Sequence, residues 1–287
     1  MTGYITLNLK NIFGLFKPAQ TAMLMFTAVI GYLTPHTFPF SVYTLLYIII
    51  IEMLAISGTT SINMYLDRDL DAIMERTKNR PIPSMAISSG ASRLIGYSLL
   101  IVSIVASIII ISYFFALTVF LGYFFDIIIY TILLKRRTSL NIIFGGVAGG
   151  MPILGGWVAR TGGFSTVGFL LFALILTWIP LHTWVISSIN QGDYRAARIP
   201  NVPSVTSPGT LFLYLFFASI AFLFISAEIY FLGFTTYLTP LITSGFTAII
   251  IYWSYKAFLR DDIIALRRVR VITSPMLGIV LLILLIR

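Results

Sequence analysis

The 287-residue chain is 58% hydrophobic and only 10% charged, with a mean hydropathy of +0.97. This composition excludes a soluble globular domain and indicates an integral membrane protein. The chain has no cysteine and two histidines, which excludes disulfides, thiolate metal sites and cysteine nucleophiles. Its net charge of +9 indicates how the chain is oriented in the membrane and does not indicate a nucleic-acid partner, because the positive charges fall in loops between apolar stretches.

In chain order, the apolar stretches are each long enough to cross a hydrocarbon core of ~30 Å. They are continuous and do not alternate, which favours helices over the strands of a membrane barrel. The first stretch follows Lys10 and Lys17 directly, with no cleavage pattern before it. The predicted spans lie near 18–34, 41–62, 93–112, 114–134, 140–159, 166–190, 209–231, 236–258 and 271–287. We therefore predict an all-α integral membrane protein, with nine transmembrane helices in one bundle and one domain over residues 1–287.

The loops between these spans alternate in charge. One set of loops carries 17 of the 19 lysines and arginines, whereas the other set and the C-terminus carry only Arg160 and Arg287. Cytoplasmic loops of membrane proteins carry the excess of positive charge. We therefore predict a multi-pass protein of the cell membrane with a cytoplasmic N-terminus and an external C-terminus.

The end of the second predicted span carries a patterned group of polar residues. Asn63, Asp67 and Asp71 are spaced four residues apart, so on a helix they lie on one face and offer an amide and two carboxylates to one point. Such an acidic face needs a compensating cation, and Mg²⁺ is usually held by one or two carboxylates together with substrate phosphate oxygens. The alternative is a solvated charged loop that caps an apolar helix.

Two basic clusters occur on the same predicted side of the membrane. Arg76, Lys78 and Arg80 follow the acidic group directly and supply donors for an anion. Lys135 and Arg136 follow the fourth predicted span, where such a cluster enforces topology, contacts anionic lipid, or neutralises the same anion. These alternatives stay open on charge alone.

Three stretches together carry a resemblance to a known family: 63–81, 130–157 with its paired glycines, and 178–194 with its Trp-Ile-Pro-Leu-His-Thr-Trp segment. They resemble the UbiA superfamily of membrane prenyltransferases, and within it the branch that modifies protoheme. In many superfamily members a second aspartate lies four residues after the position of Asp193, whereas Ala197 stands there in this chain. The protoheme branch shares that feature.

The resemblance implies a fold, a reaction and a set of site residues. It implies a hydrophobic cavity under a polar cap, facing the cytoplasm, in which a prenyl group is transferred from farnesyl or geranylgeranyl diphosphate to protoheme IX. Mg²⁺ is the implied cofactor, with Asp67, Asp71 and Asp193 as metal ligands and Asn63 beside them as a catalytic residue. The implied diphosphate-binding residues are Arg76, Lys78, Arg80, Lys135 and Arg136. The implied acceptor-binding residues are Tyr130, His182 and Trp184.

Several residues within the predicted spans have more than one interpretation. The glycines of the fifth span serve close helix packing, or they form a bare face against which a flat macrocycle lies. His182 is a core histidine, an axial iron ligand or a proton-transfer group. Glu52, Asp126 and Glu228 are acids within spans, which point into a cavity or are paired. We assign no contact to Lys17 and Pro18, because Ala19 and Gln20 stand where the family commonly has an arginine.

Two rival functions remain open on the sequence. The first is another activity of the same superfamily, on an aromatic or glycerol-phosphate lipid acceptor. The second is a transporter with acids along its substrate path. The transporter hypothesis leaves Asn63, Asp67 and Asp71 unexplained, because transport sites lie near the middle of the membrane whereas these residues lie at its edge.

Overall fold

A computed structural model of the chain describes residues 9–260 and 262–286, and within this part it contains helices and no β-strand. The long helices are α2 (Pro18–Leu33), α3 (Val42–Leu66), α5 (Ser89–Ala106), α6 (Tyr113–Tyr123), α7 (Asn141–Thr161), α8 (Thr166–Ile189), α11 (Pro208–Phe231), α12 (Leu238–Arg260) and α13 (Ile263–Ile283). Two π-helices, η1 (Ser107–Ile111) and η2 (Phe124–Leu134), continue α5 and α6. The short helices are α1 (Leu9–Leu15), α4 (Arg68–Ile73), α9 (Gln191–Ala196) and α10 (Val202–Val205). The predicted all-α fold is confirmed.

Six helical segments of the described chain are long and apolar enough to cross a membrane. They are α3, α5 with η1, α6 with η2, α7, α8 and α11. A seventh candidate is the pair α1 and α2, which is bent by 55° at the break between them. The protein is therefore a multi-pass membrane protein.

The last helix begins earlier than its apolar stretch. The predicted range started at residue 271, but α13 starts at Ile263 and includes Arg267, Arg268 and Arg270. Asp262 caps this helix by accepting a hydrogen bond from the backbone N–H of Ile264, at 2.7 Å. Hydropathy locates the part of a helix that lies in hydrocarbon, whereas the cap and the following polar turn set where the helix begins.

Serine side chains begin most of the long helices. The hydroxyls of Ser41, Ser88, Ser112, Ser165 and Ser207 each accept a hydrogen bond from the backbone N–H three residues later. These bonds satisfy N–H groups that have no partner inside the helix, which matters most at the edge of a membrane, where an unpaired donor is costly.

Glycines allow the helices to approach one another closely. A Cβ atom on Gly31 of α2 would lie 2.0 Å from the carbonyl oxygen of Ile153 in α7, and a Cβ on Gly156 of α7 would lie 2.0 Å from that of Ala28 in α2. The pair therefore packs backbone against backbone, as small residues permit in membrane helices. In the same way, Gly58 of α3 faces Gly96 of α5.

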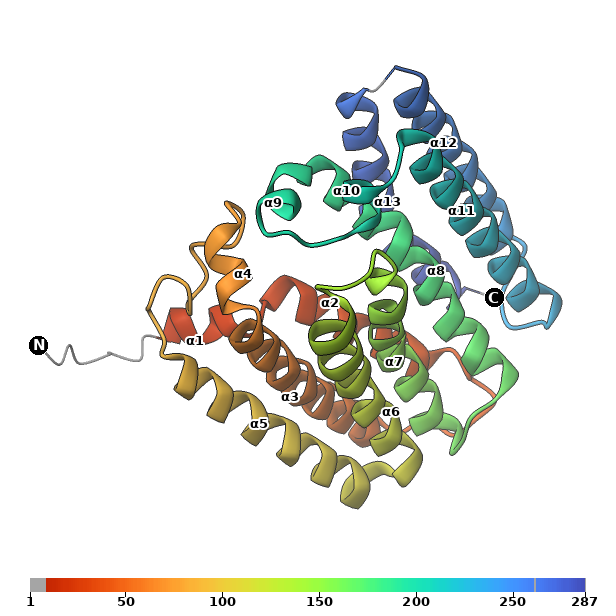
Figure 1. The fold of residues 1–287 in the computed structure, drawn as a ribbon. Helices are drawn as coiled ribbons and strands as arrows, with labels where there is room; N and C mark the ends of the chain where they lie inside the picture. The colour runs from red at the N-terminus through yellow and green to blue at the C-terminus, as the bar shows by residue number, and fades with distance from the viewer. Residues whose placement is uncertain (1–8, 261, 287) are drawn as a thin grey trace, which may run out of the picture.

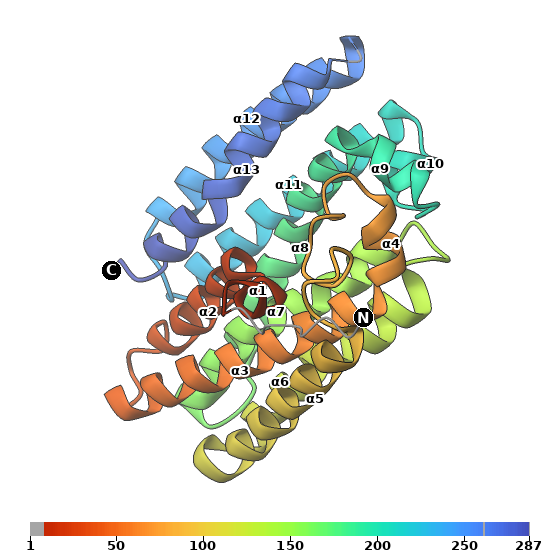
Figure 2. The same cartoon turned by 90° about the vertical axis from the view of Figure 1, so that its left-hand side faces the viewer.

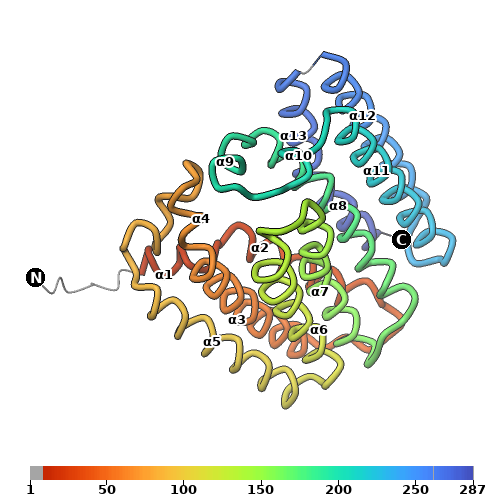
Figure 3. The backbone as a smooth tube through the Cα atoms, viewed as in Figure 1, coloured from red at the N-terminus to blue at the C-terminus, as the bar shows by residue number. Residues whose placement is uncertain are grey.

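The long helices pack side by side in a bundle, and the short helices gather at one end of it (Figures 1 and 2). Helices α4, α9 and α10 lie at this end, together with Asp67, where α3 ends. We call it the charged end, defined by Asp67, Asp71 and Asp193. Helices α11, α12 and α13 form the group farthest from α5 (Figure 3).

Candidate functional site

Asn63 is the centre of a hydrogen-bond network at the charged end. Its side chain is buried, and its amide nitrogen donates to Asp67 Oδ2 at 3.0 Å and to Thr131 Oγ1 at 2.9 Å. Its amide oxygen accepts from Lys17 Nζ at 2.7 Å. Lys135 Nζ, from the turn after η2, donates to the same Oδ2 of Asp67 at 2.5 Å. Two lysines distant in sequence thus converge on one amide-carboxylate pair.

Asp67 leaves one oxygen available. Its side chain is only 2% exposed, yet Oδ1 is buried without a hydrogen-bond partner within residues 9–260 and 262–286. A buried carboxylate oxygen without a donor is costly. The site therefore suits a ligand or cation that would complete this oxygen's contacts.

The helix carrying the acidic group breaks at Asp67. The expected continuous helix through Asn63, Asp67 and Asp71 is wrong in this respect, because α3 ends at Leu66 and α4 begins at Arg68. Backbone hydrogen bonds from Asp67 N to Asn63 O, at 2.9 Å, and from Asp71 N to Asp67 O, at 2.8 Å, keep the four-residue spacing across the break. Asp71 is buried, and both of its carboxylate oxygens accept from one nitrogen of Arg80 at 2.8 Å.

Asp193 connects two segments of the charged end. Its carboxylate accepts hydrogen bonds from the backbone N–H groups of Glu75 and Arg76, both at 3.2 Å. Its side chain therefore ties α9 to the loop after α4. This contact joins segments more than 110 residues apart in sequence and places all three predicted acids at the charged end.

The other predicted diphosphate-binding residues lie at the surface of the charged end. Arg136 forms two parallel hydrogen bonds of 2.7 Å with Asp69, which raise the pKa of the guanidinium and lower the pKa of the carboxyl. Lys78 pairs with Glu75 at 2.6 Å, and the side chain of Arg76 is exposed.

Lys135, in contrast, is mostly buried. Burial disfavours the charged form of Lys135, but the hydroxyl of Tyr130 and the carboxylate of Asp67 outweigh burial and raise its pKa.

Lys17 is a site residue that the sequence interpretation missed. It adopts a left-handed backbone conformation with φ of 45°, directly before Pro18 at the first position of α2. The residue before a proline is disfavoured in the right-handed helical region, and a non-glycine residue with positive φ is uncommon. This turn carries the lysine side chain to Asn63. The signal in the sequence was the Lys-Pro pair just before a span.

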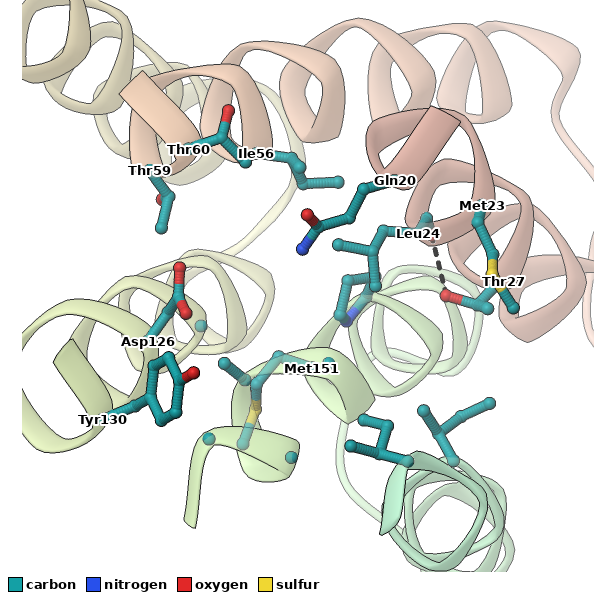
Figure 4. Close-up of a pocket in the computed structure, with 18 of the residues that line it drawn as sticks. Gln20, Met23, Leu24, Thr27, Ile56, Thr59, Thr60, Asp126, Tyr130 and Met151 are labelled. Carbon is teal, nitrogen blue, oxygen red and sulfur yellow. Dashed lines mark hydrogen bonds between the residues drawn. The ribbon is translucent and has the colours of Figure 1, made fainter. Parts of the chain in front are cut away.

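A cavity of about 540 Å³ lies among α2, α3, α6, η2, α7 and α8. Toward the charged end its lining includes Ala19, Thr60, Tyr130 and Thr183. Asp126 and Gln20 also line it and project into it from opposite sides (Figure 4). Most of the remaining lining is apolar. The cavity is of the size and character of a site for a mostly apolar small molecule.

The glycines of α7 fall into two groups, those that line the cavity and those that do not. Gly145, Gly146 and Gly149 line the cavity. Gly150 and Gly156 do not, and instead accommodate Phe172 and the backbone of α2. The lining glycines also allow close packing, because a Cβ atom on Gly145 would lie 2.8 Å from the Tyr130 ring and one on Gly149 would lie 2.5 Å from Ile179.

The three predicted acceptor-binding residues separate in space. Tyr130 and His182 line the cavity. The imidazole of His182 stacks on Trp178 with ring centroids 4.8 Å apart, and its Nδ1 lies 3.3 Å from Thr273 Oγ1. Trp184 is buried outside the cavity lining, and its ring packs on Tyr214.

The acids at the charged end fit a divalent cation that shares its coordination with a ligand. The described residues contain no group of three or more His, Cys, Asp or Glu side chains arranged to hold a metal by themselves. Mg²⁺, however, is typically bound by one or two carboxylates plus phosphate oxygens and water. The unpartnered Oδ1 of Asp67, beside Asn63 and near Asp71, supplies that chemistry. Asp193 is held by backbone donors instead.

These features define a multi-pass helical membrane protein in which a cluster of acids and lysines lies at one end of a mostly apolar cavity. The chain matches the UbiA prenyltransferase family over residues 24–273. It is similar to the protoheme IX farnesyltransferase of Archaeoglobus fulgidus, with 39% identity over 275 residues that cover 95% of each chain. The chain belongs to the UbiA prenyltransferase family, and it is a prenyltransferase.

Solved structures share the fold. A digeranylgeranylglyceryl phosphate synthase matches with a TM-score of 0.80 at 19% identity, covering 97% of each chain. A UbiA homologue from Archaeoglobus fulgidus bound to GPP and Mg²⁺ matches with a TM-score of 0.65 at 16% identity, covering 96% of this chain and 99% of that one. At these identities the likeness concerns the fold alone.

Proposed function

We propose that this prenyltransferase transfers a farnesyl group, or a longer prenyl group, from its diphosphate to a vinyl group of protoheme IX, giving heme O in heme A biosynthesis. The observation that carries the proposal is the cavity, which has glycines of α7 and His182 in its wall and the Asn63 network near its charged end. The 39% identity to a protoheme IX farnesyltransferase over 95% of both chains supports the choice of acceptor.

The proposed topology is nine spans in a single domain, with the charged end facing the cytoplasm as a polar cap over the cavity. The lysines and arginines of this end support that orientation. The diphosphate stays in the cap, and the prenyl chain extends into the cavity. In this arrangement charge remains near water and hydrocarbon remains in the apolar interior.

In the proposed donor site, Asp67 and Asp71 would hold Mg²⁺ together with the diphosphate, with Asp193 nearby and Asn63 fixing the position of Asp67. When bound, the metal ion supplies Lewis-acid stabilisation of the leaving diphosphate. Lys135 and Arg80, which pair with Asp67 and Asp71 in this structure, would donate to the same diphosphate. Arg76, Lys78 and Arg136 add positive charge at the rim, since they are exposed.

As the bond between the allylic carbon and the diphosphate oxygen breaks, residues of this chain determine which groups can react with that carbon. Positive charge from Lys135 and Lys17 stabilises the leaving group. The vinyl group of the acceptor forms the new carbon–carbon bond, and the resulting cation is captured by one water, which loses a proton. Apolar lining residues exclude other water, because early capture would only hydrolyse the donor.

The acceptor is proposed to lie in the part of the cavity between Tyr130 and His182, against Gly145 and Gly149. His182 faces this space and is oriented by Trp178 and Thr273. Trp184 contributes through the packing of α8 rather than by contact, since it lies outside the lining.

The test uses purified protein with heme B, farnesyl diphosphate and Mg²⁺, and mass analysis of the extracted heme. The expected product is heavier by one prenyl group plus one water, and it is absent when divalent metal is chelated and returns with added Mg²⁺. Geranylgeranyl diphosphate is tested in parallel. If neither donor modifies heme, while a phenolic acid or a glycerol-phosphate lipid becomes prenylated, the proposed acceptor is wrong and the prenyltransferase assignment stands.

A further inference from the structure

Glu52 is a buried acid at the end of the cavity farthest from the charged end. It lies in α3, fifteen residues before Asp67, which corresponds to roughly 22 Å along a helix axis. Its side chain is 3% exposed and lines the cavity. The network at Asn63 and Asp67 does not include it, and the proposed transfer gives it no role.

The lining of the cavity ends at the level of Glu52. On the neighbouring helices the lining residues farthest from the charged end are Thr27, Thr118, Pro152 and Ile175. Beyond them the buried cluster that includes Tyr32, Ile48 and Phe115 fills the space among α2, α3 and α6. The carboxyl of Glu52 is therefore part of the floor of the cavity.

The carboxyl fits a gap that a glycine leaves open. A Cβ atom on Gly155 of α7 would lie 3.2 Å from Glu52 Oε1 and 2.8 Å from Thr118 Oγ1. The side chain thus occupies the point where α3, α6 and α7 meet. The Thr118 hydroxyl donates to the carbonyl oxygen of Phe115 at 2.7 Å, so it has no proton left for Glu52.

An apolar chain that reached this floor would meet two obstacles. The Glu52 side chain occupies the volume next to Gly155, and the buried side chains of Ile48 and Phe115 lie behind it. Hydrocarbon next to the carboxyl would also take the place of any water in the cavity without offering a hydrogen bond, which is unfavourable. Both effects penalise a chain one isoprene unit too long.

We propose that Glu52 determines the length of the prenyl donor by closing the cavity, so that the enzyme prefers farnesyl over geranylgeranyl diphosphate. This inference rests on the proposed function only in that the prenyl chain occupies this cavity. The longer prenyl chain is excluded mainly by steric contact, so the size of the side chain at position 52 sets the maximum length of the prenyl donor.

The test compares geranyl, farnesyl and geranylgeranyl diphosphate as donors for wild type and three variants, using kcat/KM for diphosphate release. Glu52→Ala should raise the geranylgeranyl-to-farnesyl ratio by at least about tenfold, since a single methylene in an apolar pocket already changes selectivity to this extent. Glu52→Gln, which keeps the side-chain size and polarity, should retain the wild-type ratio, whereas Glu52→Leu, which keeps most of the bulk but removes the polar group, should raise the ratio by less than Glu52→Ala does. An unchanged ratio in Glu52→Ala, with farnesyl turnover intact, would overturn the proposal.

A fourth variant tests the same idea in the opposite direction and does not depend on the stability of Glu52→Ala. Ala55 lines the cavity one helical turn nearer the charged end. Ala55→Leu should therefore shift the preference toward geranyl diphosphate, and a ratio unchanged there as well would contradict a length limit on this face of α3. Because diphosphate release is measured, a failure of heme to act as acceptor would appear separately, as the absence of modified heme with every donor.

Discussion

Two aspartates, only two positions apart, are in opposite environments at the charged end. Asp67 is 2% exposed and is bound by Asn63 and Lys135, whereas the side chain of Asp69 is 55% exposed and pairs with Arg136. Asp67→Asn keeps the volume but removes the charge and the available oxygen. We expect it to reduce kcat by at least about 100-fold, as for the loss of a group that stabilises developing charge.

Asp69→Asn is the matched control in the same motif. Exposed ion pairs contribute little, about 0 to 1 kcal/mol, so we expect its turnover to stay within about fivefold of wild type. Both variants should insert into the membrane and purify like wild type. Equal activity of the two variants in steady-state prenyl transfer would show that the Asn63 network is structural.

The residues that could be predicted from the sequence are those related by helical spacing. Asn63 and Asp67 do interact four residues apart. Lys135 and Lys17 reach the same pair from 68 and 46 residues away in sequence, and no local pattern encodes those contacts. The sequence interpretation assigns no contact to Lys17, because the residues after it do not match the family, yet the Lys17 side chain donates to Asn63.

At the scale of helices, hydropathy gave the location of the long segments but not their irregularities. The break at Asp67, and the π-helix η2 that carries Asp126 and Tyr130 into the cavity wall, follow from tertiary contacts. In η2, Thr131 Oγ1 donates to the carbonyl oxygen of Asp126 five residues earlier and accepts from Asn63. π-helical turns are frequent at functional sites, and no residue preference identifies them in advance.

The packing of α2 on α7 depends on single glycines. Gly156→Ala would place a methyl group 2.0 Å from the carbonyl oxygen of Ala28, and the backbone of α2 would have to move. We expect a loss of at least about 2 kcal/mol in stability, in the range of overpacked cores. Unfolding of the detergent-solubilised protein, followed by circular dichroism against denaturant or temperature, measures it.

Gly278→Ala is the control for this prediction. Gly278 is also inside a helix, α13, but a Cβ there would meet no atom within 4 Å. Its substitution should be neutral or should stabilise by up to about 1 kcal/mol, because alanine favours the helix over glycine. Similar unfolding midpoints for the two variants would show that α2 and α7 can separate without cost.

At the scale of the whole molecule, the orientation of the bundle decides from which side the donor enters. The charge asymmetry that predicts this orientation is a property of the loops, so it could be obtained from the sequence. The gathering of α4, α9 and α10 at a single end depends on contacts such as that between Asp193 and the backbone of residues 75 and 76. The separation of Trp184 from the cavity likewise depends on how α8 is rotated, which its mixed apolar surface does not specify.

The absence of cysteine makes this topology directly measurable, since each introduced cysteine is the only thiol. Thr37 and Tyr237 are exposed at the end opposite to the charged end, and Ser84 and Leu259 are exposed at the charged end. We expect Thr37→Cys and Tyr237→Cys to react with a membrane-impermeant maleimide in intact cells. Ser84→Cys and Leu259→Cys should react only in inverted vesicles, because positively charged loops stay in the cytoplasm. Labelling of Ser84→Cys in intact cells would reverse the proposed orientation, and labelling of Tyr237→Cys and Leu259→Cys from the same side would mean that α12 does not span the membrane.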